Sequence, residues 1–269
     1  MPAPTLVLPP RLTTDSDAIA NVALTAGWHV ERLVNWRPPA HLRGLDLVLY
    51  GEPLFAEVIA SALDLALLEA PYDWLVHLPV CYTQRTISFT TLGEARELTE
   101  PAFIKPVESK SFPAAVYESG EHLPSAETLP GATPVLVAET VNWEVEFRCF
   151  ILDRQVMTSS PYWRHDELAQ EADGTWQAPA EECEQAQGFI TTFLADETIA
   201  LPPAVVVDVG RIQGRGWAVI EANAAWGSGL YGCNAARALP VLRRACTRRE
   251  HLAVEDVPWV IEKGMEIEW

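Results

Sequence analysis

The sequence has little positive charge. Its 269 residues include 19 lysine and arginine residues against 37 aspartate and glutamate residues, a formal net charge of −18. Binding to a nucleic-acid backbone or to an anionic lipid surface needs a concentrated positive field, so the composition argues against a nucleic-acid or membrane partner. The acidity is typical of a solubilising surface. Any lysine or arginine that binds an anion therefore has to lie in a local cluster of positive charge.

The cysteine pattern excludes both a disulfide framework and a common metal site. The number of cysteines is odd, and neither a CxxC motif nor a His/Cys pair has the spacing of metal ligands. Reduced thiols in a cytoplasmic protein are the expectation. The five cysteines are Cys81, Cys149, Cys183, Cys233 and Cys246.

Targeting and membrane signals are also missing from the sequence. The chain starts Met-Pro-Ala-Pro without a basic segment followed by an apolar run, so no signal peptide is expected. The longest apolar stretch, residues 58–68, is interrupted by Ser61 and Asp64 and is too short to cross a bilayer. The sequence has no internal repeat and no low-complexity tract. We therefore expect a cytoplasmic protein with ordinary globular lobes.

The first part of the chain has the pattern of a small α/β lobe. Short apolar runs at residues 5–8, 30–34 and 45–50 predict strands. Helix caps at Thr13-Thr14-Asp15 precede apolar residues at helical spacing up to Gly27, and residues 54–68 indicate a mostly buried helix. With 49% hydrophobic residues, the chain has enough apolar side chains for such a core. We expect this lobe to cover residues 1–84.

The remainder predicts two further parts and an α+β fold overall. Residues 102–134 are rich in Pro, Gly, Ser and Glu and carry little that could form a core, which is typical of a small mobile flap. A strand closed by Lys105-Pro106 and a hairpin partner at 114–117 are expected there. We assign residues 85–137 to a flap and central subdomain and 138–269 to a C-terminal lobe. Strands are expected at 135–138, 145–152, 155–158, 204–209 and 217–221, and helices at 186–194 and 239–246.

Two apolar runs near the C-terminus each end in a carboxylate. One reads Val-Val-Val-Asp208-Val-Gly, and the other reads Val-Ile-Glu221-Ala-Asn223. Residues i and i+2 of a strand share a face, and a hairpin through Gly214 and Gly216 would bring Asp208 beside Glu221 and Asn223. Two carboxylates and an amide oxygen suit Mg²⁺ beside a polyphosphate. The alternative is a hairpin with solvated ends, although the apolar runs favour burial, and a buried carboxylate needs a cation or donors.

Basic residues follow two other predicted strands. Lys105 closes the strand Phe-Ile-Lys-Pro, and Lys110 follows in a flexible stretch, so both ammonium groups could neutralise the same phosphates. Arg148 lies in Glu144-Val-Glu146-Phe-Arg148, where alternation puts the three charged residues on one face. Arg148 would face phosphates or a substrate carboxylate there. The alternatives are surface lysines and a half-exposed strand with its charges in water or in a cross-strand ion pair.

These three pieces, in this order, resemble the ATP-grasp superfamily from about Gln84 to about Asn234. The resemblance implies ATP clamped between two α+β lobes and a carbon–nitrogen bond made through an acyl phosphate. It implies that Asp208, Glu221 and Asn223 hold Mg²⁺ and that Lys105 contacts the α and β phosphates. The strand Val135–Glu139 resembles the hinge, which implies that Leu136, Val137 and Ala138 meet adenine through their main chain and that Glu139 binds the ribose. It also implies that Lys110 and Arg148 are catalytic.

Two departures from the family pattern stand out. Arg85 occupies the place of an earlier phosphate-binding lysine, and Lys110-Ser-Phe-Pro replaces a multi-glycine loop. Together with Tyr231-Gly232 after the Gly227-Ser-Gly229 loop, these features look like a bacterial subgroup of the superfamily.

The expected activity is an ATP- and Mg²⁺-dependent ligase that joins a carboxylate to an amine. Its substrates would be small molecules or peptides, and a homodimer is left open. The alternatives are a kinase-like phosphotransferase, a nucleotide-binding protein without catalysis, and an interaction domain whose motifs match by chance. No cysteine or histidine is expected to be a nucleophile. The sequence does not identify the carboxylate or the amine.

Overall fold

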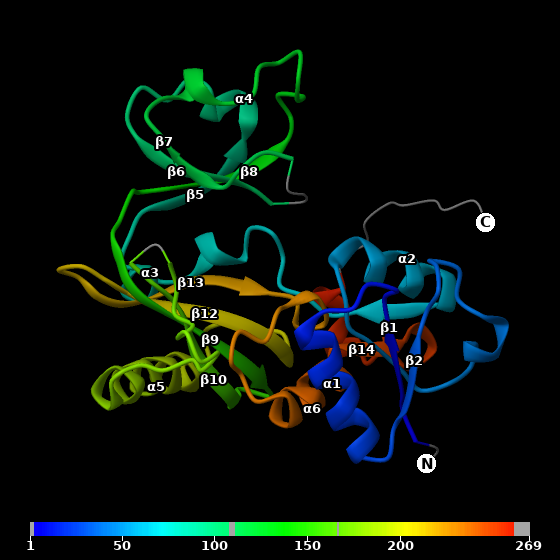
Figure 1. Ribbon diagram of the computed structural model, residues 1–269. Coiled ribbons are helices and arrows are strands. Elements are labelled where there is room, and N and C mark those ends of the chain that lie inside the picture. Colours follow the sequence, from blue (N-terminus) through cyan, green and yellow to red (C-terminus); the bar gives the residue numbers. More distant parts are fainter. Residues whose placement is uncertain (1–2, 108–110, 166, 261–269) are drawn as a thin grey trace. The chain divides into compact units, whose positions relative to one another are not determined.

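The computed structural model describes residues 3–107, 111–165 and 167–260 (Figure 1). These residues form an α+β fold, as predicted. They separate into two compact units, of which unit 1 comprises Met1–Ala70, Val145–Val209 and Glu221–Trp269, and unit 2 comprises Pro71–Glu144 and Gly210–Ile220. No helix within the described residues is long and apolar enough to span a membrane. The three-part division expected from the sequence stays a prediction.

The N-terminal part of unit 1 is built on a parallel sheet of order β2-β1-β3. β1 is buried along its whole length because it is the central strand. The predicted cap at Thr13 is confirmed: its hydroxyl accepts the Ser16 amide in a capping box. α1 ends before Gly27, whose φ of +79° is left-handed. The bounds are β1 (Thr5–Leu8), α1 (Thr14–Thr25), β2 (His29–Arg32), β3 (Leu47–Leu49) and α2 (Pro53–Leu63).

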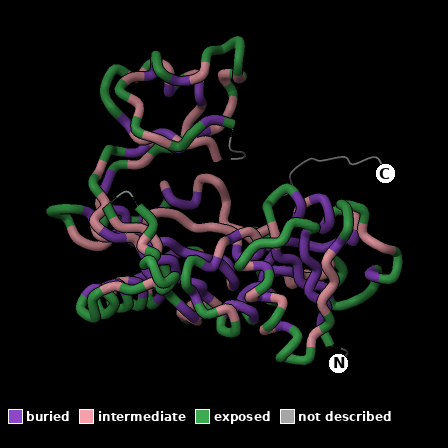
Figure 2. Tube along the Cα trace, viewed as in Figure 1, coloured by how far each residue is buried: buried purple, intermediate pink, exposed green. Residues whose placement is uncertain are grey.

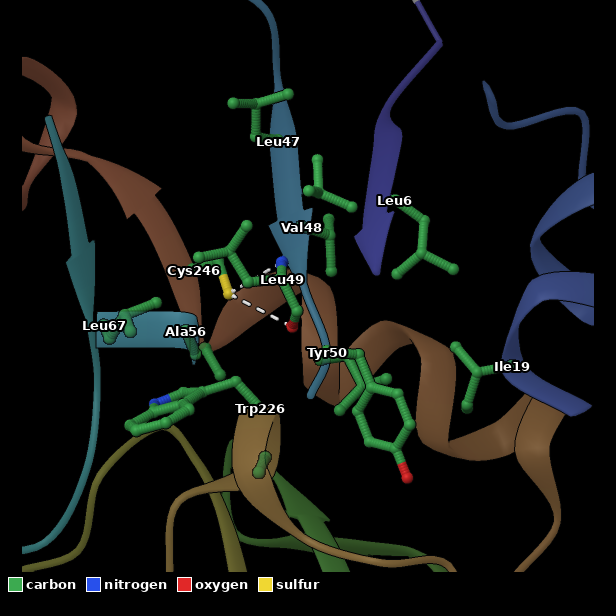
Figure 3. Packing of buried hydrophobic residues seen from close by; sticks show 14 of the residues in the cluster. Leu6, Ile19, Leu47, Val48, Leu49, Tyr50, Ala56, Leu67, Trp226 and Cys246 are labelled. Carbon is green, nitrogen blue, oxygen red and sulfur yellow. Dashed lines mark hydrogen bonds between the residues drawn. The ribbon is translucent and has the colours of Figure 1, made fainter. Parts of the chain in front are cut away.

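The helix predicted over residues 54–68 is wrong at its C-terminal end. Asp64 adopts a left-handed conformation with φ 56°, which ends α2. Residues Leu65–Leu67 then form β4, which pairs with β14 (Cys246–Arg248), a segment far away in the sequence. Figure 3 shows the core on this side, where Leu49, Leu67, Trp226 and Cys246 pack together.

A five-stranded sheet of order β11-β10-β9-β12-β13 carries the rest of unit 1. The turn predicted at Asp153-Arg154 is confirmed, and both residues have positive φ. β10 is longer than the predicted strand, and the last helix starts earlier than predicted because Asn234 caps it. The strands are β9 (Trp143–Leu152), β10 (Gln155–Arg164), β11 (Glu167–Leu168), β12 (Ala204–Ile212) and β13 (Gly216–Asn223), and the helices are α5 (Ala180–Ala195) and α6 (Ala235–Arg244).

Unit 2 contains an antiparallel sheet of order β5-β8-β6-β7. The expectation that residues 102–134 hold little core is wrong. Alternate residues of β6, Ala102 and Ile104, join Phe112, Leu123 and neighbouring side chains in a small core of their own. The elements are α3 (Val80–Thr83), β5 (Ile87–Thr91), α4 (Leu92–Ala95), β6 (Ala102–Pro106), β7 (Ala115–Tyr117) and β8 (Pro134–Ala138).

Short 3-10 helices connect many of these elements. Figure 2 shows that the buried residues follow the strands and the inner faces of the helices, whereas the connections are mostly exposed. Their bounds are η1 (Ala40–Leu42), η2 (Trp74–His77), η3 (Gly120–His122), η4 (Ala225–Gly227), η5 (Arg249–His251) and η6 (Val254–Trp259).

Candidate functional site

A buried ion pair joins the middle strands of the five-stranded sheet. Arg148 of β9 donates from Nε to Asp208 Oδ1 at 2.9 Å and from Nη2 to Asp208 Oδ2 at 2.7 Å. Its Nη1 donates to the main-chain oxygen of Gly229 at 3.1 Å. Arg148 is 7% exposed and Asp208 is fully buried. This burial excludes the interpretation that the two residues are solvated charges of a half-exposed sheet.

β13 adds a carboxylate and an amide to this pair. Asn223 donates from Nδ2 to Asp208 Oδ2 at 3.1 Å and to Glu221 Oε1 at 2.9 Å. The hairpin between β12 and β13 thus brings together the three residues that the sequence suggested as metal ligands. We call Arg148, Asp208, Glu221 and Asn223 the carboxylate cluster.

The carboxylate cluster carries one more negative than positive charge when both acids are ionised. Burial raises the pKa of Asp208 to about 6, Arg148 opposes that shift, and Glu221 adds to it. Burial also acts to lower the pKa of Arg148, but Asp208 outweighs this and holds it above its ordinary value. Charge of this kind in a desolvated place favours a bound cation.

Aromatic rings cover the Arg148 guanidinium. Its carbon lies 5.1 Å from the Tyr162 ring centre and 4.9 Å from that of Tyr231. The Tyr162 hydroxyl donates to Glu146 Oε2 at 2.5 Å, and Trp176 meets Tyr231 edge-on with ring centres 5.8 Å apart. The rings hold Arg148 in place from the sides that its hydrogen bonds leave open.

Sequence reasoning missed Tyr162 and Trp176 as neighbours of Arg148. β10 pairs with β9 through two register shifts, between Val156 and Thr158 and between Pro161 and Trp163. Such irregularities change which side chains share a face, so simple alternation along β10 cannot place Tyr162.

The N-terminal lobe also contributes to this place, which the sequence did not indicate. Asp15 of α1 accepts the Leu230 amide at 2.8 Å through Oδ2, next to the loop that holds Gly229. Tyr50 follows β3, and burial, with a further contribution from Asp15, raises the pKa of its hydroxyl. Figure 3 shows this hydroxyl directed away from the aliphatic side chains of β1 and β3. Arg148 also acts on the pKa of Tyr50, in the lowering direction.

A second set of the candidate residues lies in unit 2. Lys105 of β6 is opposite Leu136 of β8, and Val137 and Ala138 of β8 are opposite Ile104 and Phe103. The strand suggested for adenine and the lysine suggested for phosphate are therefore direct neighbours in one sheet.

Glu139 directly follows β8 and is held at its side-chain oxygens. Arg215 donates to one oxygen and the Thr86 amide donates to the other. These hydrogen bonds, that of Arg215 first, lower the pKa of Glu139 to about 2. Glu139 is therefore an ionised acceptor at the end of the suggested adenine strand.

Arg85 is buried against main-chain oxygens of its own unit. It donates to Thr83 O at 2.9 Å, to Val219 O at 2.8 Å and to Ile220 O at 3.1 Å. Its guanidinium carbon lies 5.0 Å from the Trp143 ring centre. This geometry gives Arg85 a structural role between α3 and β13, and contact with phosphate stays a prediction. Lys110 lies outside the described residues.

The donor set of the carboxylate cluster fits magnesium. Carboxylate and amide oxygens are hard ligands, and the excess negative charge favours a cation. The Asn223 amide already donates to both acids, and a rotated amide would present its oxygen in the same direction. Within the described part of the chain, no group of three or more His, Cys, Asp or Glu residues could hold a metal ion. A metal bound at the cluster would therefore rely on the amide as well as on the two carboxylates.

Comparison with known proteins identifies a family. Residues 82–241 match a family model described as an ATP-grasp domain, the second family of its clade. The sequence matches no curated protein sequence.

Solved structures share the fold at low sequence identity. A RimK domain protein ATP-grasp from Sphaerobacter thermophilus is 16% identical with a TM-score of 0.52, covering 90% of this chain and 99% of that one. The D-alanine–D-alanine ligase from Bacillus anthracis complexed with ATP is 12% identical with a TM-score of 0.51, covering 90% and 96%. D-cycloserine synthetase DcsG is 14% identical with a TM-score of 0.50, covering 89% and 98%.

Proposed function

The chain belongs to this ATP-grasp domain family, and we propose on that premise that it uses ATP and Mg²⁺ to join a carboxylate to an amine. The observation that carries the proposal is the carboxylate cluster, in which two acids and an amide from one hairpin converge beside a fixed arginine. The fold supports it, since several solved structures of this fold are named as ligases or synthetases.

The nucleotide is held by the sheet of unit 2 in this proposal. Main-chain groups of Leu136, Val137 and Ala138 pair with the adenine edge, and Glu139 accepts from a ribose hydroxyl. Lys105, opposite Leu136 in β6, neutralises phosphate oxygens. The adjacency of these residues in one sheet supports the proposal.

Magnesium is held by Asp208, Glu221 and Asn223. When bound, it neutralises phosphate charge that the acids alone would repel. Arg148 fixes both oxygens of Asp208, so that carboxylate keeps one orientation.

The reaction needs no covalent attachment to the protein. A substrate carboxylate oxygen attacks the γ phosphorus of ATP, the bond to the β–γ bridging oxygen breaks, and ADP leaves. The amine nitrogen then attacks the carbonyl carbon of the acyl phosphate, inorganic phosphate leaves, and the nitrogen loses a proton. Lys105 and Arg148 offset negative charge during transfer, and Lys110 is proposed for the same task. Positioning and charge account for most of the catalysis in such a transfer.

A cytoplasmic location is part of the proposal, and the free thiols support it. All five cysteines are unpaired, which fits a reducing compartment. The substrates are proposed to be small-molecule or peptide carboxylates and amines.

Nucleotide binding is tested by thermal unfolding. ATP with Mg²⁺ at millimolar concentration is expected to raise the Tm, because a ligand that binds only the folded state stabilises it. ATP with a chelator should raise it less, and Mg²⁺ alone should raise it least. An unchanged Tm under all three conditions, with a cooperative transition, would contradict nucleotide binding.

A further inference from the structure

Two adjoining hollows in unit 1 lie away from the carboxylate cluster. The first, of about 340 Å³, is lined by residues 156–159 of β10, by Gln187 of α5, and by Asn234 and Arg237 at the start of α6. The second, of about 600 Å³, is lined by Ser159 and by residues of α5 that include Cys183, Glu184, Gln187 and Gly188. Ser159 and Gln187 line both, so the hollows form one surface, which we call the β10 groove.

The β10 groove contains a free sheet edge. β10 pairs with β9 on one side, while on its other side β11 pairs only with Trp163 and Arg164. Among the residues that the structure describes, no strand pairs with Val156–Ser160 on that side. An edge of this kind offers main-chain donors and acceptors to an incoming strand. The register shifts at Val156/Thr158 and Pro161/Trp163 restrict the regular edge to a short run.

Gly188 leaves room over this edge. It lies inside α5, a helix of 16 residues, where glycine costs about 1 kcal/mol relative to alanine. A Cβ placed on Gly188 would meet no atom within 4 Å, so packing within the protein does not require glycine there. The space in front of it is the groove. A glycine at such a position allows a backbone from outside to approach closely.

Arg237 gives the groove a charge preference. Within the described residues its guanidinium takes part in no ion pair or hydrogen bond, although the chain as a whole is strongly acidic. It lines the first hollow, at the end formed by α6, whereas Glu184 lines the second. An acidic side chain on the Arg237 side of an incoming strand would therefore be favoured.

We propose that the β10 groove binds an extended peptide as an additional strand on β10, with an acidic residue beside Arg237. Taking the proposed ligation as given, this peptide is a substrate of the enzyme, anchored at a distance from the bond that is made. β10 leads from the groove to the cluster, since Ser160 lies opposite Arg148 in the sheet. The groove thus names the substrate class as peptides and adds recognition by backbone pairing.

The variants follow from Gly188. Gly188→Trp fills the groove with a large ring, and Gly188→Ala adds one methyl group into open space as its matched control. Because alanine is the better helix former, Gly188→Ala should be at least as stable as the wild type. Arg237→Glu reverses the charge at the α6 end. Urea unfolding verifies that each variant is folded before binding is measured.

The binding experiment uses a library of random peptides of about ten residues. Peptides retained by the wild type should be enriched in aspartate or glutamate and should bind Gly188→Ala equally well. Gly188→Trp should lose roughly tenfold or more in affinity for them, about 1.4 kcal/mol or more. Arg237→Glu should retain a pool enriched in lysine and arginine instead.

Cys183 supplies a measurement that needs no groove variant. It lines the second hollow and is exposed, and within the described residues Cys81 is the other exposed cysteine. In a Cys81→Ser background, retained peptides should slow the alkylation of Cys183 by a maleimide.

Failure of this inference and failure of the ligase function give different results. No enriched peptide, or equal binding to wild type and Gly188→Trp, would overturn the groove even if Mg²⁺ and ATP still raise the Tm. Concentration-dependent dimers that Gly188→Trp abolishes would assign the edge to a second copy of the chain instead. Peptide binding as described, without any response to nucleotide, would support the groove and contradict the ligase.

Discussion

Arg148 and Asp208 face each other on adjacent strands and share two side-chain hydrogen bonds, of 2.9 and 2.7 Å, in a place almost closed to water. Each group leaves the other as an uncompensated buried charge when it is removed. The pair therefore links the stability of the sheet to the orientation of a proposed metal ligand.

Arg148→Gln should lower the free energy of unfolding by about 3–5 kcal/mol, because Asp208 would stay buried without its cation. The double variant Arg148→Gln/Asp208→Asn should recover part of that loss. Urea unfolding measures both. Arg164→Gln is the control, since the Arg164–Glu182 pair is partly exposed and should contribute below about 1 kcal/mol. Equal small losses for Arg148→Gln and Arg164→Gln would contradict the account of the pair.

The raised pKa of Asp208 predicts a pH dependence of stability. Its pKa is about 6 in the folded state and 3.8 for an ordinary aspartate, so between these values the folded state binds its proton more tightly than the unfolded state. The contribution of Asp208 to the unfolding free energy is therefore most favourable below pH 4 and falls as the pH rises to about 6. The fall is on the order of 1–3 kcal/mol.

Asp208→Asn isolates this contribution. The difference in unfolding free energy between wild type and Asp208→Asn, measured by urea titration between pH 4 and 7, should shift against the wild type as the pH rises and then level off above pH 6. A difference that stayed constant, or that shifted in favour of the wild type, would show that Asp208 is ionised throughout.

Local pattern was enough to predict much of the proposed metal site. Apolar runs that end in Asp208 and Glu221, with Gly214 and Gly216 between them, describe a hairpin that brings its polar ends together. Both glycines have positive φ, as the turn requires. The N-terminal strand and the capped helix after it were visible for the same reason, because caps and periodicity are local signals.

Long-range pairing could not be predicted in the same way. Arg85 binds main-chain oxygens of Val219 and Ile220, more than a hundred residues along the chain, and nothing in its own neighbourhood indicates this. Residues 65–67 leave the predicted helix because a partner strand near the C-terminus takes them. The pairing of Arg148 with Asp208 likewise depends on the register between two strands that lie far apart in sequence.

Lys105→Ala should weaken nucleotide binding by roughly tenfold or more, since a fixed ammonium group beside β8 would be lost. Titration with a fluorescent ATP analogue measures the effect. The chain has three lysines, Lys105, Lys110 and Lys263, so Lys263→Ala is a matched control at a lysine with no proposed role. Equal affinities for the Lys105 and Lys263 variants would leave Lys105 without a role at phosphate.

Glu221→Gln should lower turnover far more than nucleotide affinity. The change keeps size and hydrogen-bonding atoms but removes one negative charge from the carboxylate cluster, and Mg²⁺ prefers carboxylate to amide oxygen. The added stabilisation of ATP by Mg²⁺ in thermal unfolding should shrink, while the effect of ATP with chelator persists. Wild-type turnover in Glu221→Gln would return the hairpin to a structural role.

The most direct test of ligation is the stoichiometry of ADP and inorganic phosphate across a matrix of carboxylates and amines, including amino acids and short peptides. The ligase account predicts that a productive pair releases ADP and phosphate in equal amounts with Mg²⁺ present. It also predicts that omitting the amine largely stops release and that Glu221→Gln loses most of it. ADP formed without free phosphate, so that the phosphoryl group stays on the acceptor, would contradict ligation and indicate a phosphotransferase.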